Sequence, residues 1–266
     1  MNKFSRILKT LSTVILCAGS AVHAEGLRSA VILQGWQDTS GVITSALEFS
    51  MDEGWKTYWR APGDAGFPPS FDFSGSENVA RVDIIWPTPS LSGSDGYETL
   101  GYQNALVMPL RITPKSAGPV TLAVAASIGV CDDICVPVDF VMTETLSPKK
   151  KRDPKIIAAL ATAPFPSDQI AGAKMTCTFS QEGSKLNVSV SSGLPKTDAW
   201  ERIVVEYADA TGWVVMDQTK REGSKLMATA TIHSGSDTTI LLARDKLRLT
   251  IVTASRSIEQ IGCARR

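Results

Sequence analysis

The cysteines are the residues of this 266-residue chain whose type and spacing point most directly to chemistry. Cys17 lies in a segment that we expect to be removed, which leaves four cysteines in the mature chain. Cys131 and Cys135 are separated by three residues, whereas Cys177 and Cys263 lie far apart in the C-terminal half. Four cysteines allow three pairings, and a division of the chain into two domains favours Cys131 with Cys135 and Cys177 with Cys263.

The Cys177–Cys263 pair would join the first strand of a second domain to its last residues. On the chain-entropy model, closing a loop of this length stabilises the folded state by about 4–5 kcal/mol. We therefore expect this disulfide to be structural.

The Cys131–Cys135 pair differs because its loop contains only Asp132, Asp133 and Ile134. In a straight strand the two cysteine Cα atoms would lie about 13 Å apart, at ~3.3 Å per residue, whereas a disulfide requires about 4.4–6.8 Å. The chain must therefore turn between the two cysteines. A bridge across so short a loop removes little entropy from the unfolded chain, so an exposed disulfide that exchanges readily is the more economical interpretation.

Two other interpretations of this pair stay open. It could be the structural staple of a hairpin, or its two thiolates could bind Cu(I), whereas zinc would require two more ligands. Asp132 and Asp133 disfavour a neighbouring thiolate, so we expect a relay that reacts within partner complexes rather than a freely reactive oxidase. The single histidine of the mature chain, His233, argues against hydrolytic catalysis by a Ser-His or Cys-His pair. We expect neither a cofactor nor a metal.

Residues 1–24 have the features of a secretory signal peptide. Cations precede a short apolar segment at residues 11–18, and small residues follow at 22–24. The apolar segment is too short to cross about 30 Å of hydrocarbon as a helix. We therefore expect a soluble mature protein outside the cytoplasm, in an oxidising compartment.

The charge balance argues against nucleic acid as a partner. The whole chain has 27 Lys plus Arg and 27 Asp plus Glu. Residues 1–24 contain three of the cations, Lys3, Arg6 and Lys9, and no acid, which leaves 24 cations against 27 acids in the mature chain. A mildly acidic protein lacks the cations that nucleic acid binding requires.

Alternating apolar and polar residues between 27 and 145 predict short strands separated by Pro- and Gly-rich turns. This pattern is typical of an antiparallel β-sandwich, which we assign to residues 25–146. The residues expected to face inward are Ile43, Leu47, Phe49 and Met51, then Ala80, Val82, Ile84 and Trp86, then Leu106, Met108, Leu110 and Ile112, and then Val138, Phe140 and Met142.

Residues 147–168 differ from the segments on either side. The basic run at 149–152 is expected to be a solvated linker. Asp153 as N-cap and Pro154 as the first helical residue predict a short helix, and Pro164 is expected to end it.

Strand patterns resume after Thr176 and predict a second β domain over residues 169–266. The predicted fold is therefore all-β, with two immunoglobulin-like β-sandwich domains joined by a short helical linker. The strands expected in the second domain include residues 186–190, 203–207, 213–216, 226–232, 239–242 and 247–252.

Four segments of the first domain resemble the amino-terminal periplasmic domain of the thiol:disulfide interchange protein DsbD, and they resemble the related ScsB proteins more closely. These segments are residues 54–69, 86–89, 96–102 ahead of Pro109, and 130–137. The second domain resembles the extra β domain of the ScsB-like members only loosely. The resemblance implies an immunoglobulin-like domain in which Cys131 and Cys135 form the exchangeable pair.

The resemblance also implies partners and a cap. In that family the domain takes electrons from a thioredoxin-like module fed by a membrane segment, and it reduces periplasmic proteins of the thioredoxin fold. An aromatic cap loop covers the family's cysteine pair, which points to Tyr97 as the cap and to Tyr102 as the second choice. Residues 54–69 would frame the same active edge, and the aromatic residues of this segment suit either the edge or the core: Trp55, Tyr58, Trp59 and Phe67.

Together these features predict a periplasmic thiol–disulfide exchange protein without a cofactor. Because the chain ends at Arg266 with neither transmembrane helices nor a thioredoxin-like domain, we expect its electron donor to be a separate membrane protein. The alternative is a non-redox binding module, for copper or a client protein, with structural disulfides. A purely structural or adhesive exported protein is a third reading.

Overall fold

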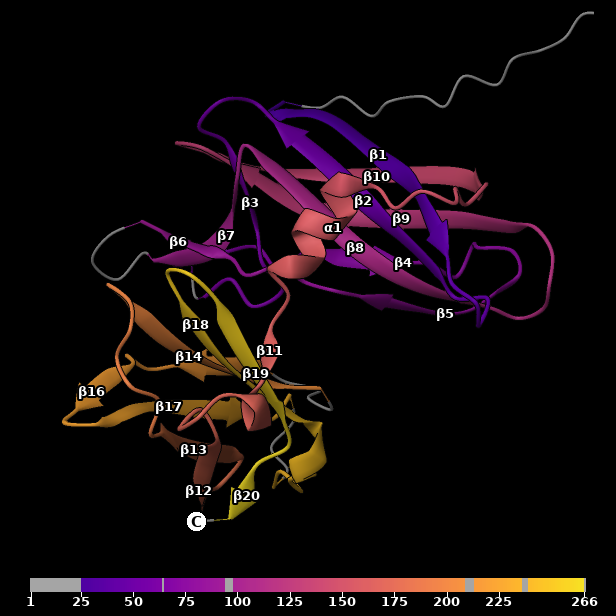
Figure 1. Ribbon diagram of the computed structural model, residues 1–266. Coiled ribbons are helices and arrows are strands. Elements are labelled where there is room, and N and C mark those ends of the chain that lie inside the picture. The colour runs from indigo at the N-terminus through magenta and orange to yellow at the C-terminus, as the bar shows by residue number, and fades with distance from the viewer. Residues whose placement is uncertain (1–24, 64, 94–97, 209–212, 236–238, 266) are drawn as a thin grey trace, which may run out of the picture.

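The computed structural model describes residues 25–63, 65–93, 98–208, 213–235 and 239–265. The predicted signal peptide and the predicted cap residue Tyr97 lie outside these ranges. The described chain forms four β-sheets and one α-helix, and Figure 1 shows the sheets gathered into two sandwiches. The prediction of an all-β, immunoglobulin-like fold is confirmed.

The first sandwich consists of two antiparallel sheets. One sheet, in the order β1-β2-β8-β5, is formed by β1 (Leu27–Gln37), β2 (Ile43–Met51), β8 (Ala105–Pro114) and β5 (Val79–Ile84). The other, in the order β10-β9-β3-β7-β6, is formed by β10 (Cys135–Leu146), β9 (Val120–Cys131), β3 (Lys56–Tyr58), β7 (Thr99–Gln103) and β6 (Ser90–Ser92), and β4 (Ser70–Asp72) also pairs with β9.

Apolar residues from the facing sides of these sheets form the core of the first sandwich. The inward faces predicted for β2, β8 and β10 are confirmed, since every residue named on them is buried. On β5 the prediction for Ala80 is wrong, because this residue is exposed. A register shift between Val79 and Arg81 marks an irregularity in the pairing with β8, and a bulge of this kind changes the face to which the following side chains point.

The second sandwich has its own hydrophobic core. One sheet, in the order β11-β19-β18-β14, is formed by β11 (Phe165–Pro166), β19 (Ser257–Ile261), β18 (Leu247–Thr253) and β14 (Glu201–Tyr207). The other, in the order β15-β17-β13-β12-β20, is formed by β15 (Trp213–Met216), β17 (Lys225–His233), β13 (Lys185–Ser192), β12 (Met175–Glu182) and β20 (Ala264–Arg265), and β16 (Lys220–Glu222) also pairs with β17. Two 3-10 turns, η1 (Ser167–Gln169) and η2 (Arg244–Lys246), lie in the connections.

The segment between the sandwiches contains helix α1 (Pro154–Ala161). The Asp153 side chain accepts a hydrogen bond from the backbone N–H of Lys155 at 2.8 Å, and Pro154 lies in the first turn. Both predicted start signals are therefore confirmed. Ile156 is fully buried and the helix packs against β8, so the linker is fixed to the first sandwich.

Two segments of the second half differ from their predictions. Residues 165–166, expected in the linker, form β11 and pair in parallel with β19. Residues 239–242, expected to be a strand, are not one. In this segment the carbonyl of Leu241 accepts a hydrogen bond from the Tyr207 hydroxyl, which accepts in turn from the N–H of the following residue, Ala243.

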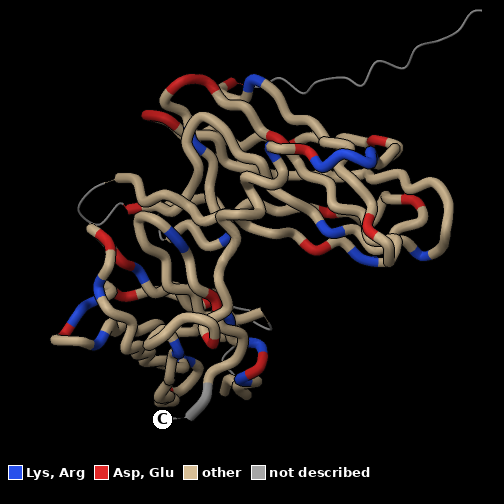
Figure 2. The backbone as a smooth tube through the Cα atoms, viewed as in Figure 1, with Lys and Arg blue, Asp and Glu red and all other residues tan. Residues whose placement is uncertain are grey.

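The surface carries mixed charge. Figure 2 shows Lys and Arg interspersed with Asp and Glu along both sandwiches. The longest basic run of the sequence, residues 149–152, lies in the linker. Within the described ranges, no helix is long and apolar enough to cross a bilayer.

The helix cap provides a test of the linker. Replacing Asp153 with Ala should lower the free energy of unfolding by about 0.5–2 kcal/mol, because the N–H of Lys155 loses its acceptor. Asp153→Asn is the matched control, since Asn caps helices as well as Asp does. Urea unfolding of the three proteins measures the difference, and equal losses in both variants would show that the charge rather than the cap is stabilising.

Candidate redox site

The short cysteine pair closes the hairpin between β9 and β10. Strand β9 ends at Cys131, β10 begins at Cys135, and the two residues are directly opposed in the antiparallel register. Their Cα atoms lie 4.1 Å apart and their sulfurs form a disulfide. The backbone N–H of Asp132 donates to the carbonyl of Ile134 at 3.0 Å and tightens the turn. The chain therefore reverses between the cysteines, as their spacing required.

The two cysteines differ in their access to solvent. Cys131 is fully buried, whereas Cys135 is exposed. An attacking sulfur must reach the sulfur that it attacks, so Cys135 is the accessible one. Two exposed apolar residues lie on the same part of the fold: Ile134 in the turn is 58% exposed, and Phe67, beside Gly129 of β9, is 42% exposed.

Tyr58 at the end of β3 contacts the accessible sulfur. Its hydroxyl oxygen lies 3.2 Å from Cys135 Sγ. The ring fits between two glycines, since a Cβ added to Gly129 or Gly66 would lie 3.1 or 3.2 Å from ring carbons. Burial raises the pKa of the Tyr58 hydroxyl above its ordinary value. The hydroxyl therefore stays protonated at neutral pH and able to donate to sulfur.

Lys56 brings a cation to the same strand. It is paired with Cys131 in the β3–β9 register. Its ammonium donates to the hydroxyls of Ser92 and Thr99, each at 3.1 Å, and lies 5.9 Å from the centroid of the Tyr58 ring. Lys56 therefore joins the strand beside the cysteines to the β6–β7 hairpin.

The predicted cap residues have different positions. Tyr97 lies outside the described residues. Tyr102 on β7 is buried in the core of the first sandwich, and its hydroxyl donates to the carbonyl of Pro87 at 2.7 Å. Burial raises the pKa of Tyr102 well above its ordinary value. Within the described part of the chain, Tyr58 contacts Cys135, and for this residue the sequence left core and active edge open.

The long-range cysteine pair lies in the second sandwich. A disulfide joins Cys177 of β12 to Cys263, with 5.9 Å between the Cα atoms. Both residues are buried. His233 stacks on Trp213 at 4.9 Å between ring centroids, in this sandwich rather than near the short pair. Among the described residues, no group of three or more His, Cys, Asp and Glu side chains is placed to hold a metal.

Comparison with known proteins finds a family model that matches part of the chain and a solved structure with a similar fold. Residues 30–147 match the family model of the N-terminal domain of thiol:disulfide interchange protein DsbD. The fold is similar to the crystal structure of the N-terminal periplasmic domain of ScsB from Proteus mirabilis, with a TM-score of 0.57 and 20% sequence identity. That similarity covers 89% of this chain and 92% of the ScsB chain, so it includes both sandwiches. None of the curated proteins matches the chain.

The family match and the site concern the same residues. The matched range contains Cys131, Cys135 and Tyr58, together with the strands that hold them. Residues 30–147 therefore match the family of DsbD N-terminal domains that their motifs predicted, and this family implies a part in thiol–disulfide exchange.

Proposed function

We propose that this chain is a periplasmic thiol–disulfide exchange protein that relays electrons through the Cys131–Cys135 pair. Its donor would be a thioredoxin-like module linked to the membrane, and its acceptors would be periplasmic proteins of the thioredoxin fold. The observation that carries the proposal is a disulfide with one buried and one exposed cysteine, the exposed one in contact with a tyrosine hydroxyl. The family match to residues 30–147 supports it.

The exchange takes two steps that involve only sulfur and protons. A thiolate of the reduced donor attacks Cys135 Sγ, the intramolecular S–S bond breaks, and Cys131 leaves as a thiolate that takes up a proton. The donor's second cysteine, as a thiolate, then attacks the donor sulfur that is bonded to Cys135. Cys135 leaves as a thiolate and takes up the second proton. Two electrons and two protons have then passed to the pair, and the same steps in reverse reduce an acceptor.

Tyr58 would assist the steps in which Cys135 carries charge. A hydrogen bond donated to a thiolate favours the charged form and lowers the pKa of the thiol. The protonated Tyr58 hydroxyl, 3.2 Å from Cys135 Sγ, is placed to donate one. Asp132 and Asp133 oppose this effect, but both are exposed, and water and salt weaken the influence of exposed charges.

The surroundings of Cys135 suit a docked partner. The exposed side chains of Ile134 and Phe67 offer apolar surface beside the accessible sulfur. A partner that covers them removes apolar area from water, which favours binding at about 25 cal/mol per Å² before the costs of association. A complex of this kind places the partner's thiolate beside Cys135, so the cysteine pair does not need to be strongly reactive in the free protein.

The two disulfides should respond differently to a glutathione redox series. We expect Cys131–Cys135 to titrate within the series, while the buried Cys177–Cys263 bridge stays oxidised, as structural disulfides with potentials below about −300 mV do. Alkylation followed by mass spectrometry reports each cysteine separately. Simultaneous reduction of both pairs would contradict the division into an exchangeable and a structural disulfide.

Single-cysteine variants test which sulfur is attacked. Cys131→Ala leaves the exposed Cys135 thiol and should form a mixed disulfide with a thioredoxin whose only active-site cysteine is activated as an aromatic disulfide. Cys135→Ala leaves the buried thiol, and its reaction should be slower by about tenfold or more, because access to the sulfur limits exchange. A non-reducing gel over time gives both rates. Faster capture by Cys135→Ala would reverse the roles.

Replacing Tyr58 with Phe tests the hydroxyl. We expect reaction of the reduced protein with an oxidised small disulfide to slow by about three- to tenfold at neutral pH, equivalent to about 1 kcal/mol of hydrogen bonding. Tyr102→Phe is the matched control, because it removes another buried tyrosine hydroxyl from the same sandwich. It should lower stability and leave the rate unchanged. A slower rate in Tyr102→Phe alone would contradict the role proposed for the Tyr58 hydroxyl.

A further inference from the structure

The two sandwiches meet through apolar side chains and through arginines that cross between them. Val204 of β14 and Val252 of β18 are buried in the core cluster of the first sandwich. Arg60, from the first sandwich, and Arg202, from the second, each form an ion pair with the other sandwich. Figure 1 shows β14 and β18 beside the β6–β7 hairpin. The contact between the sandwiches therefore includes charged groups on segments that also serve the redox site.

Arg60 is held by two carboxylates of the second sandwich. Its Nε lies 2.9 and 3.1 Å from the two carboxylate oxygens of Glu206, and its Nη2 lies 2.7 Å from Glu259 Oε2. A further bond of 3.3 Å joins Nη2 to the hydroxyl of Thr250. The Arg60 side chain is only 10% exposed. The rigid fork of the guanidinium bonds with three side chains of the second sandwich at once, so the position of the Arg60 side chain is fixed.

Arg60 is two residues from the tyrosine that contacts Cys135. Trp59, between them, is fully buried and donates its backbone N–H to the carbonyl of Leu100 at 3.0 Å. The guanidinium of Arg60 lies 4.3 Å from the centroid of the Trp59 ring. Of three consecutive residues, Tyr58 thus contacts the sulfur, Trp59 is buried in the core and Arg60 bonds with the second sandwich. A change in the position of Arg60 is therefore transmitted to Tyr58 through a short, restrained backbone.

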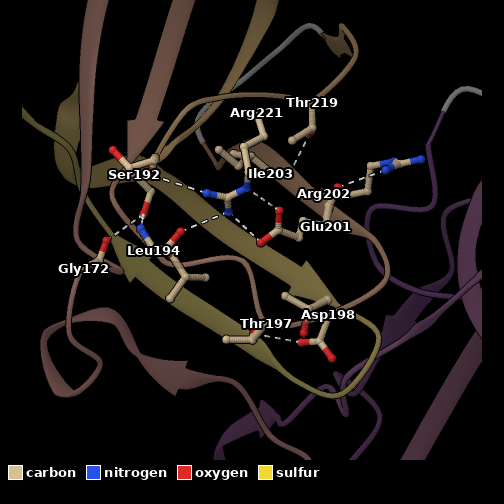
Figure 3. Close-up of polar contacts among 12 residues, drawn as sticks. Gly172, Ser192, Leu194, Thr197, Asp198, Glu201, Arg202, Ile203, Thr219 and Arg221 are labelled. Atoms are coloured by element: carbon tan, nitrogen blue, oxygen red, sulfur yellow. Dashed lines mark hydrogen bonds and ion pairs between the residues drawn. The ribbon is translucent and has the colours of Figure 1, made fainter.

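A second ion pair joins the second sandwich to the segment that precedes β7. Arg202 of β14 bonds with Glu98, which precedes β7. The next residue, Thr99, accepts from the ammonium of Lys56, the residue paired with Cys131. Figure 3 shows Arg202 extending from the second sandwich toward the first. In the first sandwich, one arginine contact therefore involves the residue that follows Trp59 after β3, and the other involves the residue that precedes β7.

We propose that the second sandwich sets the reactivity of the Cys131–Cys135 pair by fixing where the Tyr58 hydroxyl lies, and that Arg60 is the positioning residue. This inference rests on the proposed exchange function and assigns a role in it to the second sandwich. A hydrogen bond weakens steeply when its distance or angle departs from the optimum. Loss of the ion cluster therefore weakens donation to the Cys135 thiolate, although Arg60 does not touch sulfur.

The test uses Arg60→Lys in the full chain, because Lys keeps the charge and loses the forked geometry. Reaction of the reduced variant with iodoacetamide across pH, and its exchange with a small disulfide, give the ionisation midpoint of Cys135 and the rate. We expect the midpoint to rise and exchange to slow by about threefold or more, as for a weakened charge-assisted hydrogen bond. An unchanged midpoint and rate would overturn the proposal.

A double-mutant cycle separates positioning from general destabilisation. If Arg60 acts through Tyr58, Arg60→Lys should slow exchange little further in a Tyr58→Phe background, since coupled residues are not additive. Additive effects would overturn the proposal. Glu206→Gln serves as a second variant if Arg60→Lys does not fold, because it alters the cluster from the second sandwich and keeps the side-chain shape. The same criteria then apply to Glu206→Gln with Tyr58→Phe.

Ser257→Ala is the matched control at the same interface. It removes the 2.8 Å hydrogen bond between Ser257 and Thr88, which also joins the sandwiches, and it leaves the Arg60 cluster intact. Its exchange rate should equal that of the wild type, and a matching decrease would overturn the specific role of Arg60. All readouts use small reagents, so failure of the wild type to exchange with thioredoxin contradicts the proposed function alone.

Discussion

The antiparallel register of β9 against β10 is the constraint on which the candidate redox site depends. Twelve cross-strand pairs run from Val120 opposite Leu146 to Cys131 opposite Cys135. A shift of one residue would move every side chain of β10 to the other face, so the core residues Phe140 and Met142 hold the register that opposes the cysteines. The disulfide therefore closes a geometry that the core has already set.

A glycine within β9 makes room for the tyrosine. The Tyr58 ring lies against Gly129, where a Cβ would approach both this ring and the Phe67 Cβ within 3.1 Å. Gly129 is paired with Pro137 on β10, at the end of the sheet next to the cysteines. Because Gly129 has no side chain, an aromatic residue from β3 reaches a sulfur on β10 across β9. Close approach of this kind is a common reason for glycine within a strand.

Local signals in the sequence were sufficient for most of the predicted strands, the helix start and the short pair. Strand alternation and the Asp153-Pro154 cap act between residues that are near neighbours in the chain, and the short pair spans five residues. The contacts that complete the site join distant residues: Tyr58 and Cys135 are 77 positions apart, and Arg60 lies 146 and 199 positions from its two carboxylates. Only tertiary packing brings such residues together, so no spacing rule identifies them. The strand predicted for residues 239–242 is wrong, and the contact at this segment is again between distant residues, since the Leu241 carbonyl bonds with the hydroxyl of Tyr207.

The long-range disulfide lies close in sequence to one carboxylate of the ion cluster. Glu259, which holds Arg60, lies on β19, and Cys263 follows four positions later. The bridge to Cys177 ties the end of this segment to β12 on the other sheet of the second sandwich. Closing so long a loop restricts the unfolded chain far more than the Cys131–Cys135 bridge does. The Cys177–Cys263 disulfide thus ties down the segment that presents a carboxylate to Arg60, and in the proposed exchange only the short disulfide beside Tyr58 opens.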